Sequence, residues 1–204
     1  MPRARVRFPE AEALEAALAL GVHPLVGTGE TDAATMICLR AGSDGDELLL
    51  CRRARRPGDP WSGHMGLPGG RREAGDADAL ATAVRETEEE VGFHPQEAGR
   101  VLGALPVLET RRPTFHVRVA TFVARIEPGV EPSVSEELET AWWVPLGLLR
   151  AARVEVPDLP VRVPAYLAPE LDGPPAVVWG MTFRMLTLLR RAGGGDPRAA
   201  NALG

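Results

Sequence analysis

Apolar and polar residues follow two different periods along this chain. Spacings of three and four residues predict helices over 9–20, 77–91 and 179–191. Short apolar runs and alternating patterns predict strands at 35–39, 47–51, 101–108, 116–126 and 140–144. The first two strands flank the turn sequence AGSDGD, which predicts a β-hairpin.

Two stretches lack a regular pattern. Residues 52–70 are rich in arginine, proline and glycine, which predicts a loop, and the six prolines of 156–175 exclude a long regular element there. A segment as long as 156–175 is typical of a lid or binding loop, so we expect specificity determinants in it. Strands mixed with two or three helices indicate one α/β (α+β) domain over 31–192. A helical segment at 1–30 precedes this domain, and a loose tail at 193–204 follows it.

Composition and charge exclude several classes of function. Of the 204 residues, 45% are hydrophobic and 25% charged, which is typical of a globular protein, and the net charge of −5 gives no broad attraction to nucleic acid. No apolar run approaches the roughly 18 residues of a membrane span. All 23 basic residues are arginine, which excludes a Walker A loop and a pyridoxal-phosphate Schiff base because both need lysine. No signal-peptide pattern is present, and Cys38 and Cys51 lie in apolar runs like buried reduced thiols, so we expect a cytoplasmic protein.

The helix over 77–91 carries the clearest chemistry. Its predicted core-facing stripe consists of Leu80, Val84, Thr87 and Val91. Glu86, Glu89 and Glu90 project from another face, where we expect them to be exposed, and Arg85 is placed to pair with Glu89 one turn later. A divalent cation would relieve the repulsion among these carboxylates, and their hard oxygens suit Mg²⁺ or Mn²⁺. By itself, an acidic face of this kind is more often simply solvated.

The residues around this acidic face extend it into a longer motif. The stretch 70–93 reads GRREAGDADALATAVRETEEEVGF and resembles the Nudix box, G-x5-E-x7-R-E-U-x-E-E-x-G-U, in which U is apolar. Thr87 departs from the apolar U, and eight residues rather than seven separate Asp76 from Arg85. This longer spacing, with the preceding LLLCRR…WSGHMGLPGG at 48–70, is similar to the coenzyme A pyrophosphatase branch of the Nudix family.

The resemblance implies a fold and an activity. The fold would be a Nudix-type α/β/α sandwich with a mixed central sheet. The activity would be hydrolysis, dependent on Mg²⁺ or Mn²⁺, of a nucleoside diphosphate linked to another group. Glu86, Glu89 and Glu90 would be the metal ligands, and Glu89, Glu90 and Arg85 would be catalytic residues. The branch implies coenzyme A or its acyl derivatives as substrates, with 3′,5′-ADP and (acyl-)4′-phosphopantetheine as products.

Residues before the helix are candidates for substrate binding. The resemblance implies that Gly69 and Gly70 present backbone groups to metal and phosphate. Guanidinium groups match the geometry of phosphate, and the candidates among the arginines near this turn are Arg52, Arg53 and Arg71. His64 is a further candidate phosphate contact, although it stands where the branch usually has glutamine. Each of these arginines is equally consistent with an ordinary surface side chain.

The general base has two candidate sources. It is either a box glutamate or a carboxylate on a later loop, where Glu136 and Glu137 precede the strand at 140–144. An ordinary acidic surface loop is the other interpretation of these two residues.

Three functional hypotheses follow. The first is a pyrophosphatase of the coenzyme A type, and the second is a Nudix pyrophosphatase acting on ADP-ribose, NADH or dinucleoside polyphosphates. Pro106, 14 residues after Gly92, is a feature typical of ADP-ribose enzymes and keeps the second hypothesis open. The third, a nucleotide-binding module without catalysis, is disfavoured because the box glutamates and Arg85 are all present. In each case we expect a nucleotide-type small molecule as partner, neither nucleic acid nor membrane, and a monomer or homodimer.

Overall fold

A computed structural model describes residues 6–9, 11–20, 31–59, 61–112, 115–156, 159–169 and 175–192. The elements in these ranges are α1 (Ala11–Leu20), β1 (Ala33–Gly42), β2 (Gly45–Arg53), β3 (Met65–Gly66), β4 (Gly69–Arg71), α2 (Ala79–Val91), β5 (Gly99–Arg112), β6 (Phe115–Ile126), β7 (Leu138–Pro145), the 3-10 turn η2 (Leu146–Leu148), β8 (Arg150–Val154), β9 (Val163–Ala168), β10 (Ala176–Trp179) and α3 (Gly180–Ala192). The predicted tail at 193–204 lies outside the described residues, and the proposed domain boundaries stay predictions.

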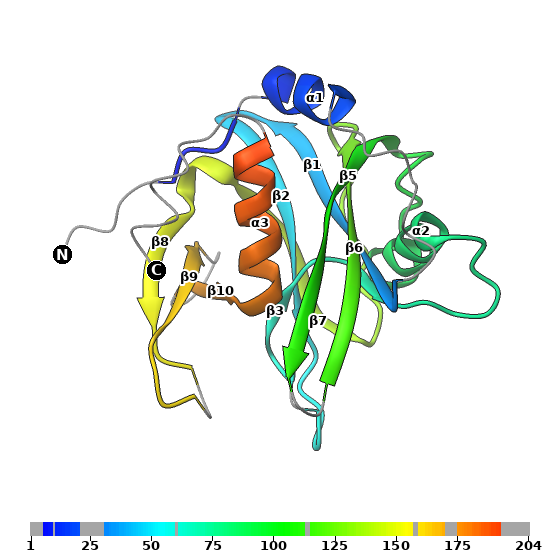
Figure 1. Ribbon diagram of the computed structural model, residues 1–204. Helices are drawn as coiled ribbons and strands as arrows, with labels where there is room; N and C mark the ends of the chain where they lie inside the picture. Colours follow the sequence, from blue (N-terminus) through cyan, green and yellow to red (C-terminus); the bar gives the residue numbers. More distant parts are fainter. Residues whose placement is uncertain are drawn as a thin grey trace.

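The main sheet is mixed, as predicted. Its strands run in the order β3-β2-β1-β6-β5, with β4 paired to β1 and β7 paired to β2. Strands β1 and β6 are parallel, whereas β1 and β2 form the predicted antiparallel hairpin. A second sheet, in the order β10-β9-β8, lies beside the first (Figure 1). Within the described residues, no helix is both long and apolar enough to cross a membrane.

Two hydrophobic cores lie on opposite faces of the main sheet. Successive residues of β1 supply both, because strand side chains alternate: Met36 packs toward α2 and Ile37 packs toward α3 and the small sheet. Figure 1 shows α2 (green) on one side of the sheet and α3 (orange) on the other. Burial of both faces explains why the first hairpin reads as continuous apolar runs. The arrangement confirms the predicted sheet between helices, and Cys38 and Cys51 are free and buried as expected.

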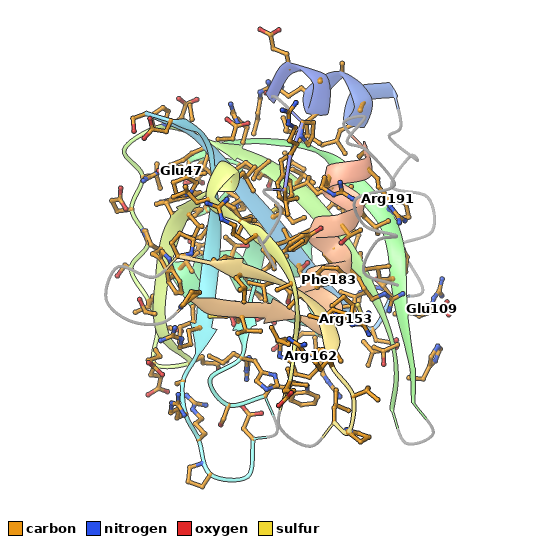
Figure 2. The ribbon with its side chains drawn as sticks, turned by 90° about the vertical axis from the view of Figure 1, so that its left-hand side faces the viewer. Glu47, Glu109, Arg153, Arg162, Phe183 and Arg191 are labelled. Atoms are coloured by element: carbon orange, nitrogen blue, oxygen red, sulfur yellow. The ribbon has the colours of Figure 1, made fainter. Side chains whose placement is uncertain are left out.

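The small sheet corrects the prediction for the proline-rich segment. Residues 156–175 contain the strand β9, and β8 and β10, which pair with it, were not predicted. Pro164 lies near the start of β9, where this strand pairs with β8 but not yet with β10. Proline is tolerated at such a position because one side of the strand is unpaired there and needs no backbone N–H donor. Arg153 and Arg162 bind each other's carbonyl oxygens on this sheet (Figure 2). The segment is therefore partly a packed strand and not one continuous loop.

The predicted loop at 52–70 also contains regular structure. Strand β3 pairs with the end of β2, and β4 pairs with the beginning of β1. These strands are only two and three residues long, and their sequences are rich in glycine, so no alternating pattern marks them. Their pairing fixes the glycine turn 66–70 against the sheet, directly in front of α2.

Helix α2 begins and ends at capping residues, Asp78 and Gly92. The Asp78 side chain accepts a hydrogen bond from the backbone N–H of Ala81 at 2.8 Å, and Gly92 closes the helix with a positive φ of 77°. The N-cap satisfies a donor that has no partner within the helix, and glycine adopts the left-handed conformation without strain. These two caps set where α2 starts and stops against the glycine turn.

We predict that Asp78→Ala lowers the free energy of unfolding by about 1 kcal/mol, because it removes the side-chain acceptor at the N-cap. Asp78→Asn, which keeps an acceptor oxygen, is the matched control and should cost much less. Urea denaturation followed by circular dichroism measures both. Equal midpoints for Asp78→Ala and the wild type would show that the cap does not stabilise the fold.

Candidate active site

Close packing of α2 positions the acidic residues. Its buried residues are Ala79, Thr82, Ala83, Val84, Thr87, Glu90 and Val91. The predicted core-facing stripe is confirmed, since Val84, Thr87 and Val91 are buried and the half-buried Leu80 packs against the same core. Thr87 fits its buried position because its hydroxyl donates to the carbonyl oxygen of Ala83 at 2.6 Å. Small side chains let the helix approach β1 and β4 closely.

Glu90 lies inside this interface, which corrects the prediction that it is exposed. Only 4% of the residue is accessible, and its carboxylate accepts a hydrogen bond from the backbone N–H of Gly69 at 2.9 Å. The pKa of Glu90 is raised to about 7, chiefly by burial. The charges of Glu86 and Glu137 also act to raise this pKa, whereas the Gly69 hydrogen bond and the charge of Arg53 act to lower it. The helical projection failed here because it did not include the glycine turn that covers this part of the helix.

The two glycines of the turn are needed for close approach to α2 and β1. A Cβ atom on Gly70 would lie 2.5 Å from the carboxylate of Glu86. A Cβ atom on Gly69, where φ is +150°, would lie 2.4 Å from the carbonyl oxygen of Ala34. The glycine turn contacts the acidic site through the hydrogen bond from Gly69 to Glu90, and the role of both glycines toward metal and phosphate stays a prediction.

Arg85 holds the exposed side of the acidic face. Its NH1 atom donates to Glu86 at 3.0 Å and to Glu89 at 2.9 Å, the latter being the predicted i, i+4 pair. Its Nε and NH2 atoms donate to the two carboxylate oxygens of Asp76, both at 3.0 Å. NH2 also donates to the carbonyl oxygen of Arg71. One guanidinium thus fixes two box glutamates relative to the strand β4.

Asp76, in the loop before α2, anchors the guanidinium of Arg85. Its side chain is only 6% exposed and accepts further hydrogen bonds from the Thr82 hydroxyl and the Glu73 backbone N–H. The guanidinium of Arg85 is the main reason that the pKa of Asp76 lies well below its usual range. The additional residue between Asp76 and Arg85 therefore leaves the ion pair of the motif intact.

Two predicted candidates face the box glutamates from other elements. Glu137, just before β7, is exposed and close enough that its charge raises the pKa values of both Glu86 and Glu90. Arg53, at the end of β2, lies close enough to lower the pKa of Glu90. Arg53 also pairs with Asp59 at 3.5 Å. Sequence reasoning missed Asp59, because an aspartate between glycine and proline indicates only a turn.

The other candidates are dispersed around this centre. Arg52 lies over the ring of Trp142, with its guanidinium carbon 5.7 Å from the ring centroid, and pairs with Glu139. The His64 ring contacts Trp179 edge-on at 5.2 Å, and partial burial lowers its pKa. Glu136 is exposed, and its described contact is a backbone carbonyl that accepts a hydrogen bond from Arg56. The structure therefore favours Glu137 over Glu136 as the loop carboxylate near the site.

The side chain of Arg71 lies on the face of β4 that points away from the box glutamates. Its partner across the strands is Ala33, which packs toward the α3 side of the sheet, whereas the neighbouring Gly70 faces Glu86. The side chain of Arg71 lines a separate cavity. The backbone carbonyl of Arg71 contacts the acidic site through Arg85, whereas its guanidinium points to the cavity.

The donor set fits a hard divalent cation. Glu86, Glu90 and Glu137 gather like charges in partly buried surroundings, and the pKa of Glu86 is also raised, chiefly by burial. A cation would offset that repulsion, and carboxylate oxygens are ligands that Mg²⁺ and Mn²⁺ prefer. Among the described residues, no three acidic, histidine or cysteine side chains already form a metal-binding cluster. Arg85 and Gly69 orient the box glutamates by donating hydrogen bonds to their carboxylates.

The chain is similar in sequence to several curated proteins. It is 35% identical over 140 residues to the peroxisomal coenzyme A diphosphatase ndx-8 of Caenorhabditis elegans, covering 67% of this chain and 58% of that protein. It is 34% identical over 103 residues to the human mitochondrial coenzyme A diphosphatase NUDT8, covering 50% and 43%. It is 40% identical over 76 residues to Nudix hydrolase 15, mitochondrial, of Arabidopsis thaliana, covering 37% and 27%. The chain thus spans less than two thirds of the length of each of these relatives.

A solved structure shares the fold at low sequence identity. A MutT/nudix family protein from Enterococcus faecalis is 17% identical, with a TM-score of 0.50 over 78% of this chain and 60% of that chain. A C. elegans Ap4A hydrolase binary complex is 22% identical, with a TM-score of 0.48 over 55% of this chain and 78% of that chain.

A family model described as the NUDIX domain matches residues 30–162. This range contains the main sheet, the glycine turn and the whole acidic helix α2. The matched range covers more than half of the chain and includes the motif that positions Glu86, Glu89 and Glu90. The chain therefore belongs to the Nudix family.

Proposed function

We propose that this chain is a Nudix hydrolase that cleaves the pyrophosphate bond of coenzyme A and its acyl derivatives. The observation that carries hydrolysis is the group of facing carboxylates, Glu86, Glu90 and Glu137, beside the glycine turn. The choice of coenzyme A is supported by the relatives named coenzyme A diphosphatases and by the longer spacing between Asp76 and Arg85. The products would be 3′,5′-ADP and (acyl-)4′-phosphopantetheine. The cytoplasmic location is proposed from the sequence alone.

The box glutamates would hold the metal. When bound by Glu86, Glu89 and Glu90, Mg²⁺ or Mn²⁺ supplies positive charge to the pyrophosphate and increases the acidity of water. Arg85 keeps the carboxylates of Glu86 and Glu89 oriented through its two hydrogen bonds. Glu90 is oriented separately by Gly69, on the buried side of the helix.

Other side chains act on the proton and on the phosphate charge. Glu137 is exposed and faces Glu86 and Glu90, so it is placed to accept a proton from the attacking water. The water oxygen then bonds to one phosphorus, and the bond from that phosphorus to the bridging oxygen breaks. Arg53 lies near the same carboxylates, and its guanidinium offers donors to the phosphate oxygens. In this mechanism the chain positions charge and transfers a proton without forming a covalent intermediate.

A substrate panel tests the proposal directly. Purified protein is incubated with Mg²⁺ or Mn²⁺ and with coenzyme A, acetyl-coenzyme A, ADP-ribose, NADH or diadenosine polyphosphates, and products are resolved by chromatography. Release of 3′,5′-ADP from coenzyme A supports the proposal. Cleavage of ADP-ribose alone would refute coenzyme A as the substrate. Binding without turnover of any compound would refute the proposed hydrolase activity.

We predict that Glu89→Gln and Glu90→Gln each reduce kcat by about 100-fold or more, because each removes a charged ligand. Glu90→Gln should also stabilise the metal-free protein at pH 8 by about 1–3 kcal/mol. The pKa of Glu90 is raised to about 7 in the folded state, so its ionised form disfavours folding as the pH rises above about 4.5, and glutamine has no charge to bury.

Kinetics and thermal unfolding in a chelator measure the two effects of Glu90→Gln. Glu88→Gln, an exposed position on the same helix, is the matched control and should change neither quantity. Full activity of both Glu89→Gln and Glu90→Gln would refute the assigned roles.

We also predict that Asp76→Asn lowers the free energy of unfolding at pH 7 by about 3 kcal/mol, because it leaves Arg85 without its main partner. The pKa of Asp76 is depressed in the folded state, so its contribution is complete above the unfolded pKa and declines as the pH falls. The difference between variant and wild type should therefore shrink progressively below about pH 4. Denaturant titrations between pH 3 and 7 test this, and a difference that stays constant with pH would contradict it.

A further inference from the structure

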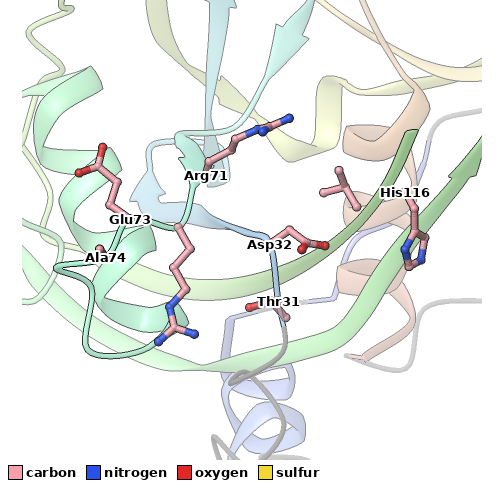
Figure 3. Close-up of a pocket in the computed structure, with 8 residues that line it drawn as sticks. Thr31, Asp32, Arg71, Glu73, Ala74 and His116 are labelled. Carbon is pink, nitrogen blue, oxygen red and sulfur yellow. The ribbon is translucent and has the colours of Figure 1, made fainter. Parts of the chain in front are cut away.

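A cavity of about 600 Å³ opens next to the acidic site, where β1 begins between β4 and β6. It is lined in part by Thr31, Asp32, Arg71, Glu73, Ala74 and His116 (Figure 3). Its volume lies within the range of pockets that hold cofactors and nucleotides. The proposed hydrolysis at Glu86 and Glu90 does not use this cavity.

The cavity is directly connected to the glycine turn. Arg71 follows Gly70, so their Cα atoms are about 3.8 Å apart. Gly70 approaches the carboxylate of Glu86, while Arg71 points to the other face of β4. The cavity and the acidic site adjoin at Glu73, which lines the cavity and has an oxygen 3.9 Å from NH1 of Arg85. A group attached to a pyrophosphate at Glu86 would therefore reach the Arg71 guanidinium along this side.

Most charged groups around the cavity are already engaged. The Asp32 carboxylate accepts the backbone N–H of Arg118 at 2.7 Å, and Arg72 donates to the carbonyl oxygens of Asp76 and Ala77. Glu73 is exposed, with an oxygen 3.9 Å from NH1 of Arg85.

Arg71 differs from these groups. Within the described part of the chain, its guanidinium has no hydrogen-bond or ion-pair partner. His116 and Asp32 line the same cavity as Arg71 (Figure 3).

We propose that this cavity receives the nucleoside end of the substrate and that Arg71 binds a phosphate monoester carried on its ribose. A free guanidinium presents donors that match a phosphate in two-point geometry, and such charge-assisted hydrogen bonds are strong. The inference rests on the proposed function, because the position of the pyrophosphate defines which group reaches Arg71. On this proposal, Arg71 distinguishes nucleotides that carry an additional phosphate on the ribose from those that lack it.

Paired ligands that differ only in that phosphate test the inference. For kinetics the pair is coenzyme A and 3′-dephospho-coenzyme A, and for binding it is 3′,5′-ADP and 5′-AMP, measured by calorimetry. The wild type should favour the ligand with the additional phosphate. Arg71→Gln should reduce this preference about tenfold or more, through KM rather than kcat, and Arg71→Lys should restore part of it.

Arg162→Gln is the matched control, since it removes the same charge from the small sheet and should leave the preference unchanged. An unchanged preference in Arg71→Gln would overturn the assignment, and so would equal losses for both members of each pair. If coenzyme A is not hydrolysed at all, the proposed function fails by itself. The binding pair still decides whether Arg71 recognises the phosphate monoester.

Discussion

The close contact between the glycine turn and helix α2 is the constraint on which the site depends. Neither Gly69 nor Gly70 has room for a Cβ atom, because one abuts β1 and the other abuts Glu86. The small buried residues of α2 complete the contact from the helix side. This packing places Glu90 in a nearly dry position, where the Gly69 N–H is its hydrogen-bond donor.

Arg85 and Asp76 balance the charge that this packing concentrates. Burial and neighbouring carboxylates make the ionised forms of Glu86 and Glu90 costly, as their raised pKa values show. The guanidinium of Arg85 neutralises the outer side of the cluster, and Asp76 fixes that guanidinium to the loop before the helix. The inner side, toward Glu137, keeps excess negative charge. A site of this kind is stabilised by binding a cation, which links its stability to the proposed catalysis.

The mixed sheet separates two tasks on its two faces. Toward α2, β4 presents Gly70 to the acidic helix, and toward α3 it presents Arg71 to the neighbouring cavity. A three-residue strand accomplishes this because successive side chains point to opposite faces. If both proposals hold, the chemistry of the pyrophosphate and the recognition of the attached group are assigned to opposite faces of the same strand.

The sequence by itself determined the elements whose signals are local. Helical periodicity located α2, alternation located β6, and the motif around Glu86 indicated the family and its acidic chemistry. The ion pair between Arg85 and Glu89 also follows from their spacing on the helix.

Only the tertiary structure decided which of the candidates come together. Glu90 is buried because a turn some twenty residues earlier in the chain covers it, which no helical projection can show. Glu137 and Arg53 reach the site through the pairing of β2 with β7, whereas Arg52, one residue away from Arg53, packs on Trp142. The short strands β3 and β4 and the small sheet arise from pairing with distant partners and leave no periodic signal of their own. Burial and charge proximity are properties of these long-range pairings, and local sequence patterns do not encode them.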